Sequence, residues 1–325
     1  MDVLQKRFGL LQSALNQEVI GQHALIESLL IALLADGHLL VEGAPGLAKT
    51  RAIRKLGEGL EGSFHRIQFT PDLLPADLTG TDVFQAQDAT FAFLPGPLFH
   101  NLILADEINR APAKVQSALL EAMAERQISV GQKTYRLADP FLVMATQNPI
   151  EQEGTYPLPD AQLDRFLLHV RVDYPAIESE RLILELARRE AIGETLTAES
   201  LVDFQPVSVD ELCQARRQVL DLYLADSLRE YLLQLVLATR QPQAYGADLE
   251  KAIQFGASPR AGIALDRCAR ARAWLAGRDH VLPEDIQQLA FEVLRHRLIL
   301  SYEAEAGGMQ VDQLIGELIA RVPVP

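Results

Sequence analysis

Apolar and polar positions divide the chain into two parts with different periodicity. Apolar residues recur at helical spacing from Val3 to Leu34, with a break at Val19-Ile20-Gly21-Gln22, so two helices are predicted there. Short apolar runs then alternate with helical stretches as far as about residue 175, which predicts a mainly parallel sheet covered on both faces. Beyond that point helical periods dominate. The pattern predicts an αβα domain over residues 1–175 and a mostly helical region over 176–325.

The individual elements follow from the same periodicities. Strands are predicted at 38–42, 67–69, 101–105 and 141–146, and helices at 50–60, 113–126, 178–192, 209–220, 227–240, 260–275 and 283–298. The segment at about 70–97 is rich in Pro, Asp and Gly, which predicts an irregular insert with a hairpin or a short helix. Residues 127–137 alternate around Gly131-Gln132, which predicts a β-hairpin.

Composition and charge exclude several classes of protein. Glu27 and Asp36 interrupt the longest apolar stretch, so no membrane insertion is expected. The first residues lack the features of a secretory signal, and Cys213 and Cys268 are the two cysteines, which together predict a cytoplasmic location and free thiols. The seven histidines show no metal-binding spacing. A formal charge of −14 would repel a phosphate backbone, so nucleic acid is an improbable partner.

The segment Gly43-Ala44-Pro45-Gly46-Leu47-Ala48-Lys49-Thr50 differs by one residue from the phosphate-loop pattern G-x-x-x-x-G-K-[ST]. Ala48 stands where the second glycine is usual, which would cost about 1 kcal/mol if that backbone has positive φ. This cost is small beside charge-assisted phosphate contacts of roughly 1.5–3 kcal/mol each. The loop follows a strand and precedes a helix, as a phosphate site requires. Lys49 would reach the β- and γ-phosphates and Thr50 would ligate Mg²⁺; a plain strand-to-helix turn is the alternative.

Two later strands end in polar side chains that suit nucleotide hydrolysis. Asp106 and Glu107 follow the strand at 101–105, at the carboxyl end where parallel sheets bind their ligands. Asp106 would hold Mg²⁺, usually through water, and Glu107 would orient or deprotonate the attacking water. Asn148 follows the next strand and would position water without adding charge. Each has a simpler explanation, as strand-capping acids or a turn-forming Asn, but their order after the loop favours a nucleotide site.

Seven segments together resemble the MoxR family of AAA+ ATPases over nearly the whole chain. They are VIGQ at 19–22, GAPGLAKT, LADEINRAP, ALLEAMAERQISV, MATQNP, LPDAQLDRF and GASPRA. Phosphate loops of this family commonly read G-x-P-G-L-A-K-T, so Ala48 agrees with the family. The resemblance implies ATP and Mg²⁺ as ligands, and an AAA+ αβα domain followed by a smaller all-helical lid domain, with ATP in the groove between them.

The resemblance also implies roles for particular residues. Ile20 would line the adenine pocket, Asn148 would be the sensor-1 residue, and Arg260 the sensor-2 arginine of the lid. Arg165 resembles the arginine finger, which acts on the nucleotide of a neighbouring subunit; a structural ion pair with the adjacent Asp164 is the alternative. Arginine suits both positions because its charge is permanent and its fork matches phosphate oxygens. Weaker candidates for contacts between subunits are Arg110 and Arg126.

The insert at 70–97 and the hairpin at 127–137 resemble the helix-2 insert and pre-sensor-1 hairpin of the AAA+ branch that includes MoxR proteins, magnesium-chelatase subunits and replicative helicases. Both would face a central pore. In helicases the hairpin touches DNA through basic residues, and Lys133 and Arg136 are available here. A solvated hairpin without a substrate is an equally good interpretation.

The resemblance implies ATP hydrolysis by a homo-oligomeric ring, with six subunits expected. The ring would remodel, mature or activate a client protein, often one with a von Willebrand factor A domain and sometimes during metal insertion. Two alternatives remain: a nucleic-acid motor of the helicase branch, which the charge of −14 disfavours, and a nucleotide-gated switch that hardly hydrolyses.

Overall fold

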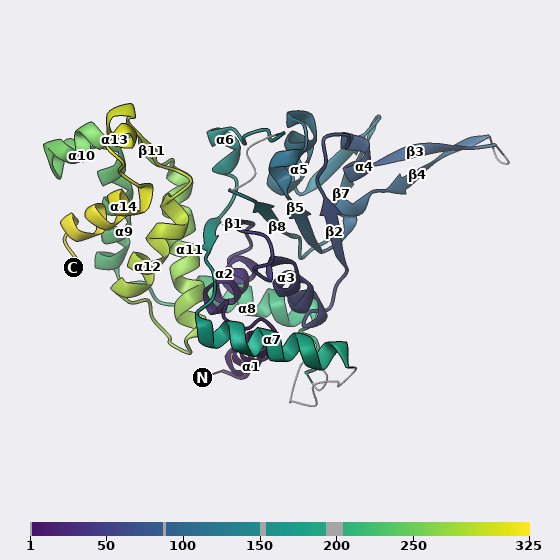
Figure 1. Cartoon of the computed structure of the whole chain (residues 1–325), viewed down its shortest axis with the longest axis horizontal. Coiled ribbons are helices and arrows are strands. Elements are labelled where there is room, and N and C mark those ends of the chain that lie inside the picture. Colours follow the sequence, from purple (N-terminus) through teal and green to yellow (C-terminus); the bar gives the residue numbers. More distant parts are fainter. Residues whose placement is uncertain (1, 87–88, 150–153, 193–203) are drawn as a thin grey trace.

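The computed structural model describes residues 2–86, 89–149, 154–192 and 204–325, and its centre is a five-stranded sheet (Figure 1). The sheet has the order β2-β5-β8-β1-β9, and every neighbouring pair is parallel. The strands are β1 (Leu39–Gly43), β2 (Phe64–Gln68), β5 (Leu102–Asp106), β8 (Leu142–Gln147) and β9 (Leu168–Val172). The carboxyl ends of all five strands therefore lie along one edge of the sheet.

The two faces of the sheet belong to separate apolar cores. Alternate residues of one strand point to opposite faces, and in β5 Leu102 and Leu104 join one core while Ile103 and Ala105 join the other. The first core is covered by α1 (Val3–Glu18), α2 (His23–Leu34) and α3 (Lys49–Glu58), and the second by α4 (Pro75–Thr79) and α5 (Ala113–Glu125). The predicted αβα sandwich is confirmed.

The C-terminal part consists mainly of helices, as predicted. They are α7 (Ile177–Ala191), α8 (Val209–Asp221), α9 (Asp226–Arg240), α10 (Ala247–Ala252), α11 (Pro259–Leu275), α12 (Pro283–Leu294), α13 (Tyr302–Ala306) and α14 (Val311–Arg321). A short antiparallel pair, β10 (Ile253–Phe255) with β11 (Ile299–Leu300), adds to the expected helices. The core beneath α1 and α2 continues without interruption into α9, α11, α12 and α14. The helical lid is thus packed firmly against the first face of the sandwich.

The central helix of this region, α11, has the residues that such a position requires. Ser258 caps its first turn through a side-chain bond to the backbone N–H of Arg260, and Pro259 occupies the first helical position. Its inner face is built from small residues, including Ala261, Ala264 and Ala271, which are buried. Small side chains allow the helix to contact α2, α8, α9 and α12 closely.

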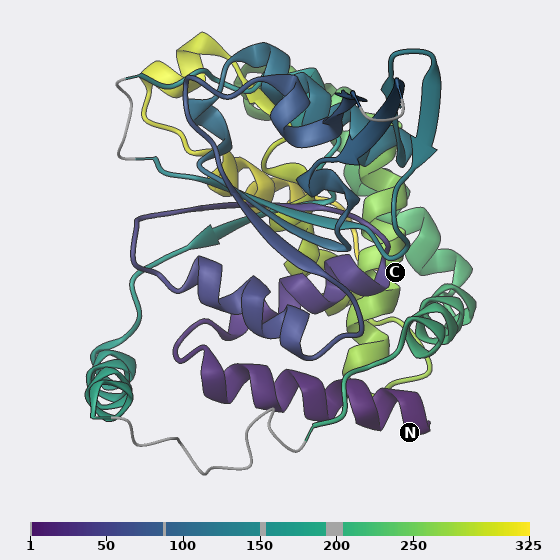
Figure 2. The same ribbon diagram turned by 90° about the vertical axis from the view of Figure 1, so that its right-hand side faces the viewer.

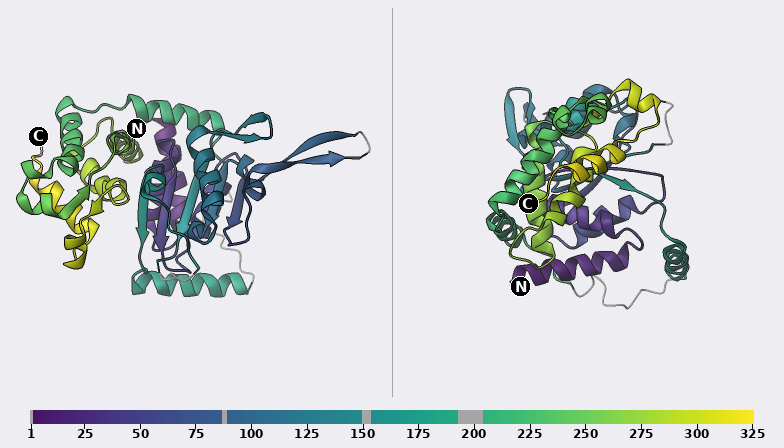
Figure 3. Two further views of the ribbon diagram at one scale, coloured as in Figure 1. Left: turned by 90° about the horizontal axis from the view of Figure 1, so that it is seen from above. Right: turned by 90° about the vertical axis from the view of Figure 1, so that its left-hand side faces the viewer.

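The segment predicted as an irregular insert contains both a short helix and a hairpin. After α4, strands β3 (Gly80–Gln85) and β4 (Thr90–Pro95) form an arm that projects far from the body (Figures 1 and 3); residues 87–88 of the predicted insert lie outside the described residues. The predicted hairpin at 127–137 is β6 (Gln127–Val130) with β7 (Lys133–Arg136). Phe93 of the arm stacks on Tyr135 of this hairpin with ring centroids 4.2 Å apart. The base of the arm and the second hairpin therefore pack together.

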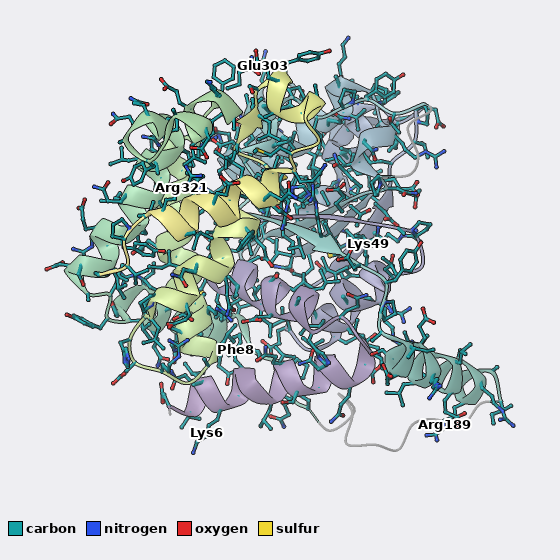
Figure 4. All side chains as sticks on the ribbon, turned by 60° about the vertical axis from the view of Figure 1, so that its left-hand side comes forward. Lys6, Phe8, Lys49, Arg189, Glu303 and Arg321 are labelled. Carbon is teal, nitrogen blue, oxygen red and sulfur yellow. The ribbon has the colours of Figure 1, made fainter. Side chains whose placement is uncertain are left out.

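Helix α7 lies apart from the other helices, at the edge of the body (Figure 2). It projects with Arg189 near its outer end, well away from Lys49 and the lid residue Arg321 (Figure 4). No helix in the described part of the chain is long and apolar enough to cross a membrane.

Candidate nucleotide site

The loop between β1 and α3 has the backbone of a phosphate-binding turn. Gly46 has φ 83° and Ala48 has φ 57°, so the alanine adopts the left-handed conformation that glycine usually supplies. Ala48 precedes the first residue of α3 and has no side-chain acceptor. The first N–H groups of α3 are therefore available to an anion, and the helix dipole favours negative charge there.

Gly43 and Lys49 hold the backbone at the start of this loop in place. A Cβ on Gly43 would lie 2.7 Å from the carbonyl oxygen of Val172, so only glycine fits. The Lys49 ammonium donates a hydrogen bond to the Gly43 carbonyl oxygen at 2.6 Å. Burial lowers the pKa of Lys49, while the nearby carboxylates of Asp106 and Glu107 act in the opposite direction. Lys49 therefore lies within electrostatic reach of both acids and can turn toward a phosphate.

A cavity of about 420 Å³ opens in front of the loop. It is lined by Pro45, Gly46, Leu47, Ala48, Lys49, Thr50, Arg51, Arg66, Asp106, Glu107, Thr146 and Asn148. The structure thus brings the predicted loop, the two acids and Asn148 into one site. Gly43 and Ala44 do not line the cavity; Ala44 is buried in the core beneath it.

The two acids are held by hydrogen bonds to neighbouring strands. The Thr146 hydroxyl donates to Asp106 Oδ1 at 2.6 Å and accepts from the Glu107 backbone N–H at 2.9 Å. Glu107 has φ 57°, an uncommon conformation for a non-glycine residue, and its Oε2 accepts bonds from Gln68 at 2.7 Å and Arg110 at 3.0 Å. A local backbone outlier at a polar cavity is typical of a functional position.

Arg51, Arg66 and Thr146 line the cavity and Gln68 bonds to Glu107, but the sequence did not single out any of these four residues. Arg66 donates to Asp106 Oδ2 through Nε at 3.1 Å and Nη2 at 2.7 Å. Arg66 and Gln68 come from β2, whose register places Gln68 beside Asp106. Their signal in the sequence was the polar-apolar alternation Arg66-Ile67-Gln68 at the end of a strand, which is also typical of an ordinary solvent-facing edge.

A smaller apolar pocket of about 100 Å³ adjoins the loop. Ile20, which the resemblance placed at the adenine, lines it together with Val19, Leu47, Pro175, Ile183 and Leu186, among others. Two of these residues come from α7, so part of the C-terminal region does border the loop. The faces of a flat aromatic ring such as adenine suit a pocket of this composition.

Arg165 and Arg260 lie outside both pockets. They share a separate hollow of about 260 Å³ with Arg126, Asp164, Arg267 and Arg297, and we call these six residues the arginine surface. Arg165 donates to the Leu120 carbonyl oxygen at 3.0 Å, whereas Asp164 pairs with Arg297 at 2.8 Å and Arg260 at 3.5 Å. Both of these ion pairs join Asp164 to arginines of the helical lid. Arg260 thus lies beside Asp164 and outside the cavity that contains Lys49, where the packing of α11 on α2 places it.

The remaining candidate arginines have partners within the chain. Arg126 binds Asp36 at 2.9 Å and the Phe141 carbonyl oxygen at 3.0 Å, and Arg110 pairs with Glu107 at 3.0 Å. Arg126 therefore has a structural role, while Arg110 belongs to the hydrogen-bond network of the cavity.

The oxygen donors in the cavity fit a magnesium ion. Thr50 supplies a hydroxyl and Asp106 a carboxylate, which are hard ligands of the kind Mg²⁺ prefers. Among the described residues there is no group of three or more His, Cys, Asp or Glu side chains that could hold a metal alone. Mg²⁺ in nucleotide sites is usually held by one or two protein ligands together with phosphates and water.

Comparison with known proteins identifies the family. The model of the ATPase family associated with various cellular activities (AAA) matches residues 38–168, and the AAA lid domain matches residues 247–318. Chaperone MoxR1 of Mycobacterium tuberculosis is 43% identical over 94% of this chain and 79% of its own length. Protein MoxR of Paracoccus denitrificans is 37% identical over 98% and 96% of the two chains. This chain belongs to the MoxR family of AAA+ ATPases.

Membership of the MoxR family agrees with the fold and gives the activity. A crystal structure of a protein from Cytophaga hutchinsonii has a TM-score of 0.90 and 44% identity, covering 99% of this chain and 96% of its own. The AAA domain and helical lid of the family are the two parts seen here. As a member of this family the protein is an ATPase that hydrolyses ATP.

Proposed function

We propose that this MoxR-family ATPase works as a homo-oligomeric ring, expected to be hexameric, in which each nucleotide cavity is completed by a neighbour. The observation that carries this proposal is the separation of Arg165 and Arg260 from the cavity that contains Lys49 and Glu107. Two arginines held beside each other on a different surface are well suited to an anion presented by another subunit. Arg260 would then act on the neighbour's nucleotide together with Arg165.

Within one subunit, the cavity residues divide the work of hydrolysis. The N–H groups of the loop and the Lys49 ammonium would hold the phosphates, while Thr50 and Asp106 would hold Mg²⁺, which neutralises phosphate charge when bound. Glu107 would take the proton of the attacking water, and Asn148 would orient that water. Ile20 and the apolar pocket would accept adenine. Arg165 from the neighbour would stabilise the charge on the transferred phosphoryl group.

We further propose that residues 1–175 and 176–325 act as the motor domain and the linker with lid, and that the ring remodels or activates a client protein. The arm supports a polypeptide client: Phe84 and Phe91 are exposed, and residues 80–96 contain no Lys or Arg. Neutralisation of phosphates depends on Lys and Arg, so this arm is poorly suited to the backbone of a nucleic acid. A client with a von Willebrand factor A domain, in some cases during metal insertion, is the finer form of this proposal.

Two measurements on the purified protein test the proposal. Mass photometry with ATP should show a closed oligomer, and ATP turnover should be unchanged by added DNA or RNA. Affinity purification from the native cell should recover a specific protein whose addition alters turnover. Strong stimulation by nucleic acid would instead support a motor, with Lys133 and Arg136 of the β6–β7 hairpin as its contacts. Single-turnover hydrolysis much slower than nucleotide release would support the switch.

A further inference from the structure

Arg66 is a third cationic side chain in the nucleotide cavity, and it contacts the residue that would hold the metal. Both Nε and Nη2 of Arg66 donate to one oxygen of Asp106, at 3.1 and 2.7 Å. The other carboxylate oxygen accepts from the Thr146 hydroxyl at 2.6 Å. Both oxygens of Asp106 are therefore engaged by protein groups, and a cation that approaches Oδ2 has to share it with the guanidinium.

The fold places Arg66 there for a clear reason. Strand β2 is the edge strand of the sheet and pairs with β5, with Arg66 opposite Leu104 and Gln68 opposite Asp106. Side chains two residues apart lie on the same face of a strand. Phe64, two residues before Arg66, packs into the core beneath α3, so Arg66 and Gln68 lie on the face that carries the phosphate loop. About half of the Arg66 side chain is exposed, so it has room to turn away.

We propose that Arg66 is a positioning residue that holds Asp106 in the metal-free cavity and gives up this contact when Mg²⁺ arrives with the nucleotide. This inference rests on the proposed nucleotide site. A guanidinium and a divalent cation repel each other at short range, and the repulsion is strong where water is partly excluded. Because about half of the Arg66 side chain is exposed, Arg66 can leave Asp106 for solvent at a modest cost.

Release of Arg66 from Asp106 would also change the hydrogen bonding of Glu107. The same Nη2 of Arg66 donates to Gln68 Oε1 at 2.9 Å, and Gln68 Nε2 donates to Glu107 Oε2 at 2.7 Å. The bond from Arg66 fixes which end of the Gln68 amide faces Glu107, since only the amino end can donate to a carboxylate. When Arg66 leaves Asp106, Gln68 loses the partner that orients it. Arrival of the metal is thereby linked to the freedom of the Glu107 carboxylate.

Metal binding in the presence of ADP tests this role without relying on turnover. We would measure free Mn²⁺ by electron paramagnetic resonance while titrating the complex of the protein with ADP. Arg66→Ala and Arg66→Gln should bind Mn²⁺ about fivefold more tightly than the native protein, because the competing ion pair is removed. Arg66→Lys, which keeps the charge but loses the planar fork, should shift the affinity less.

The matched control is Arg54→Ala, which removes an exposed arginine of α3 that pairs with Glu58 outside the cavity. It should leave Mn²⁺ affinity unchanged. Unchanged or weaker Mn²⁺ binding in both Arg66→Ala and Arg66→Gln would overturn the proposal. ADP binding measured with Mg²⁺ present distinguishes failure of the proposed nucleotide site from failure of the role of Arg66: if the native protein binds no ADP, the nucleotide site itself fails. If ADP binds normally and Mn²⁺ affinity does not respond to Arg66, only the role of Arg66 fails.

Discussion

The nucleotide cavity and the arginine surface differ in how much chemistry one subunit supplies to each. The cavity gathers the groups that can bind phosphate, hold a metal and activate water, including Lys49, Asp106 and Glu107. The arginine surface carries Arg260, which pairs with Asp164, and Arg165, which donates to the Leu120 carbonyl oxygen. The cavity thus does not include Arg165 or Arg260, and the arginine surface does not include the phosphate loop. This difference supports our proposal that two neighbouring subunits together form one complete site for ATP hydrolysis.

The largest expected effect belongs to the arginine surface. Arg165→Ala should lower the turnover number by about 10³- to 10⁵-fold, the usual contribution of an arginine supplied in trans, while ATP affinity stays unchanged. Steady-state ATPase rates and fluorescent-nucleotide binding would measure the two effects. Arg229→Ala, which removes an exposed arginine that pairs with Asp226, is the control and should keep full activity. Normal turnover in Arg165→Ala would show that Arg165 of the arginine surface does not contribute to ATP hydrolysis.

Glu107→Gln tests the cavity in the same way. The variant keeps the shape of the side chain and can still accept a hydrogen bond from Gln68, so ATP should bind as before. Loss of the proton acceptor should reduce turnover by about 10²- to 10⁴-fold. Quenched single-turnover assays would measure the chemical step directly. A variant with native turnover would show that Glu107 is not the base.

Acid pH should lower the free energy of unfolding through His38, a buried residue beside the arginine surface. His38 lines that hollow, and burial lowers its pKa to about 3. Its Nδ1 accepts from the Val143 N–H at 3.0 Å, which fixes the proton on Nε2, beside the Met123 carbonyl oxygen. As pH falls through 6.5, the unfolded chain takes up a proton that folded His38 refuses, so stability is lost. From pH 7 to 5 the free energy of unfolding should fall by about 2 kcal/mol from this group.

Urea denaturation at the two pH values would measure this loss. His38→Gln should make the difference between them smaller by about the same amount. His23→Gln, on an exposed residue at the start of α2, serves as the control and should leave the pH dependence as it is. An unaltered pH dependence in His38→Gln would contradict the assignment.

The smallest effect concerns the loop itself. Ala48→Gly removes a Cβ from a backbone with φ 57° and should stabilise the protein by up to about 1 kcal/mol, with ATP affinity intact or slightly tighter. Gly46→Ala is the reciprocal variant: φ is 83° and no atom lies within 4 Å of the added Cβ, so strain alone should destabilise it. Thermal denaturation and titration with a fluorescent nucleotide would measure both. An Ala48→Gly variant that loses ATP would mean that the loop has another role.

How much of the molecule could be predicted from the sequence depends on whether a feature is built from contiguous residues or from residues far apart in the chain. The phosphate loop is local: strand, turn and helix are contiguous, so GAPGLAKT indicated its own strand-loop-helix context, whereas the positive φ of Ala48 was only a condition that the structure answers. Asp106, Glu107 and Asn148 followed from a general property of parallel sheets, which align their carboxyl ends. The αβα sandwich and the mostly helical C-terminal part were also predicted from periodicity and confirmed, and the family resemblance added that the helices form a lid.

The position of Arg260 could not be predicted in this way. It depends on how α11 packs against α2 and α8, and this contact is set by many small buried side chains far apart in the chain. Arg66 and Gln68 were missed for a related reason: their importance arises from the register between β2 and β5. Residues that meet only through tertiary packing leave no local pattern.

Mixing two inactive variants tests the central claim most directly. Arg165→Ala subunits have an intact phosphate loop, and Lys49→Ala subunits have an intact arginine surface. In assembled mixed rings, some interfaces pair the intact loop of one subunit with the intact Arg165 of its neighbour, so ATP turnover should be partly restored and should be greatest near equal proportions. No recovery at any ratio, in rings shown to contain both variants, would contradict hydrolysis completed by a neighbouring subunit.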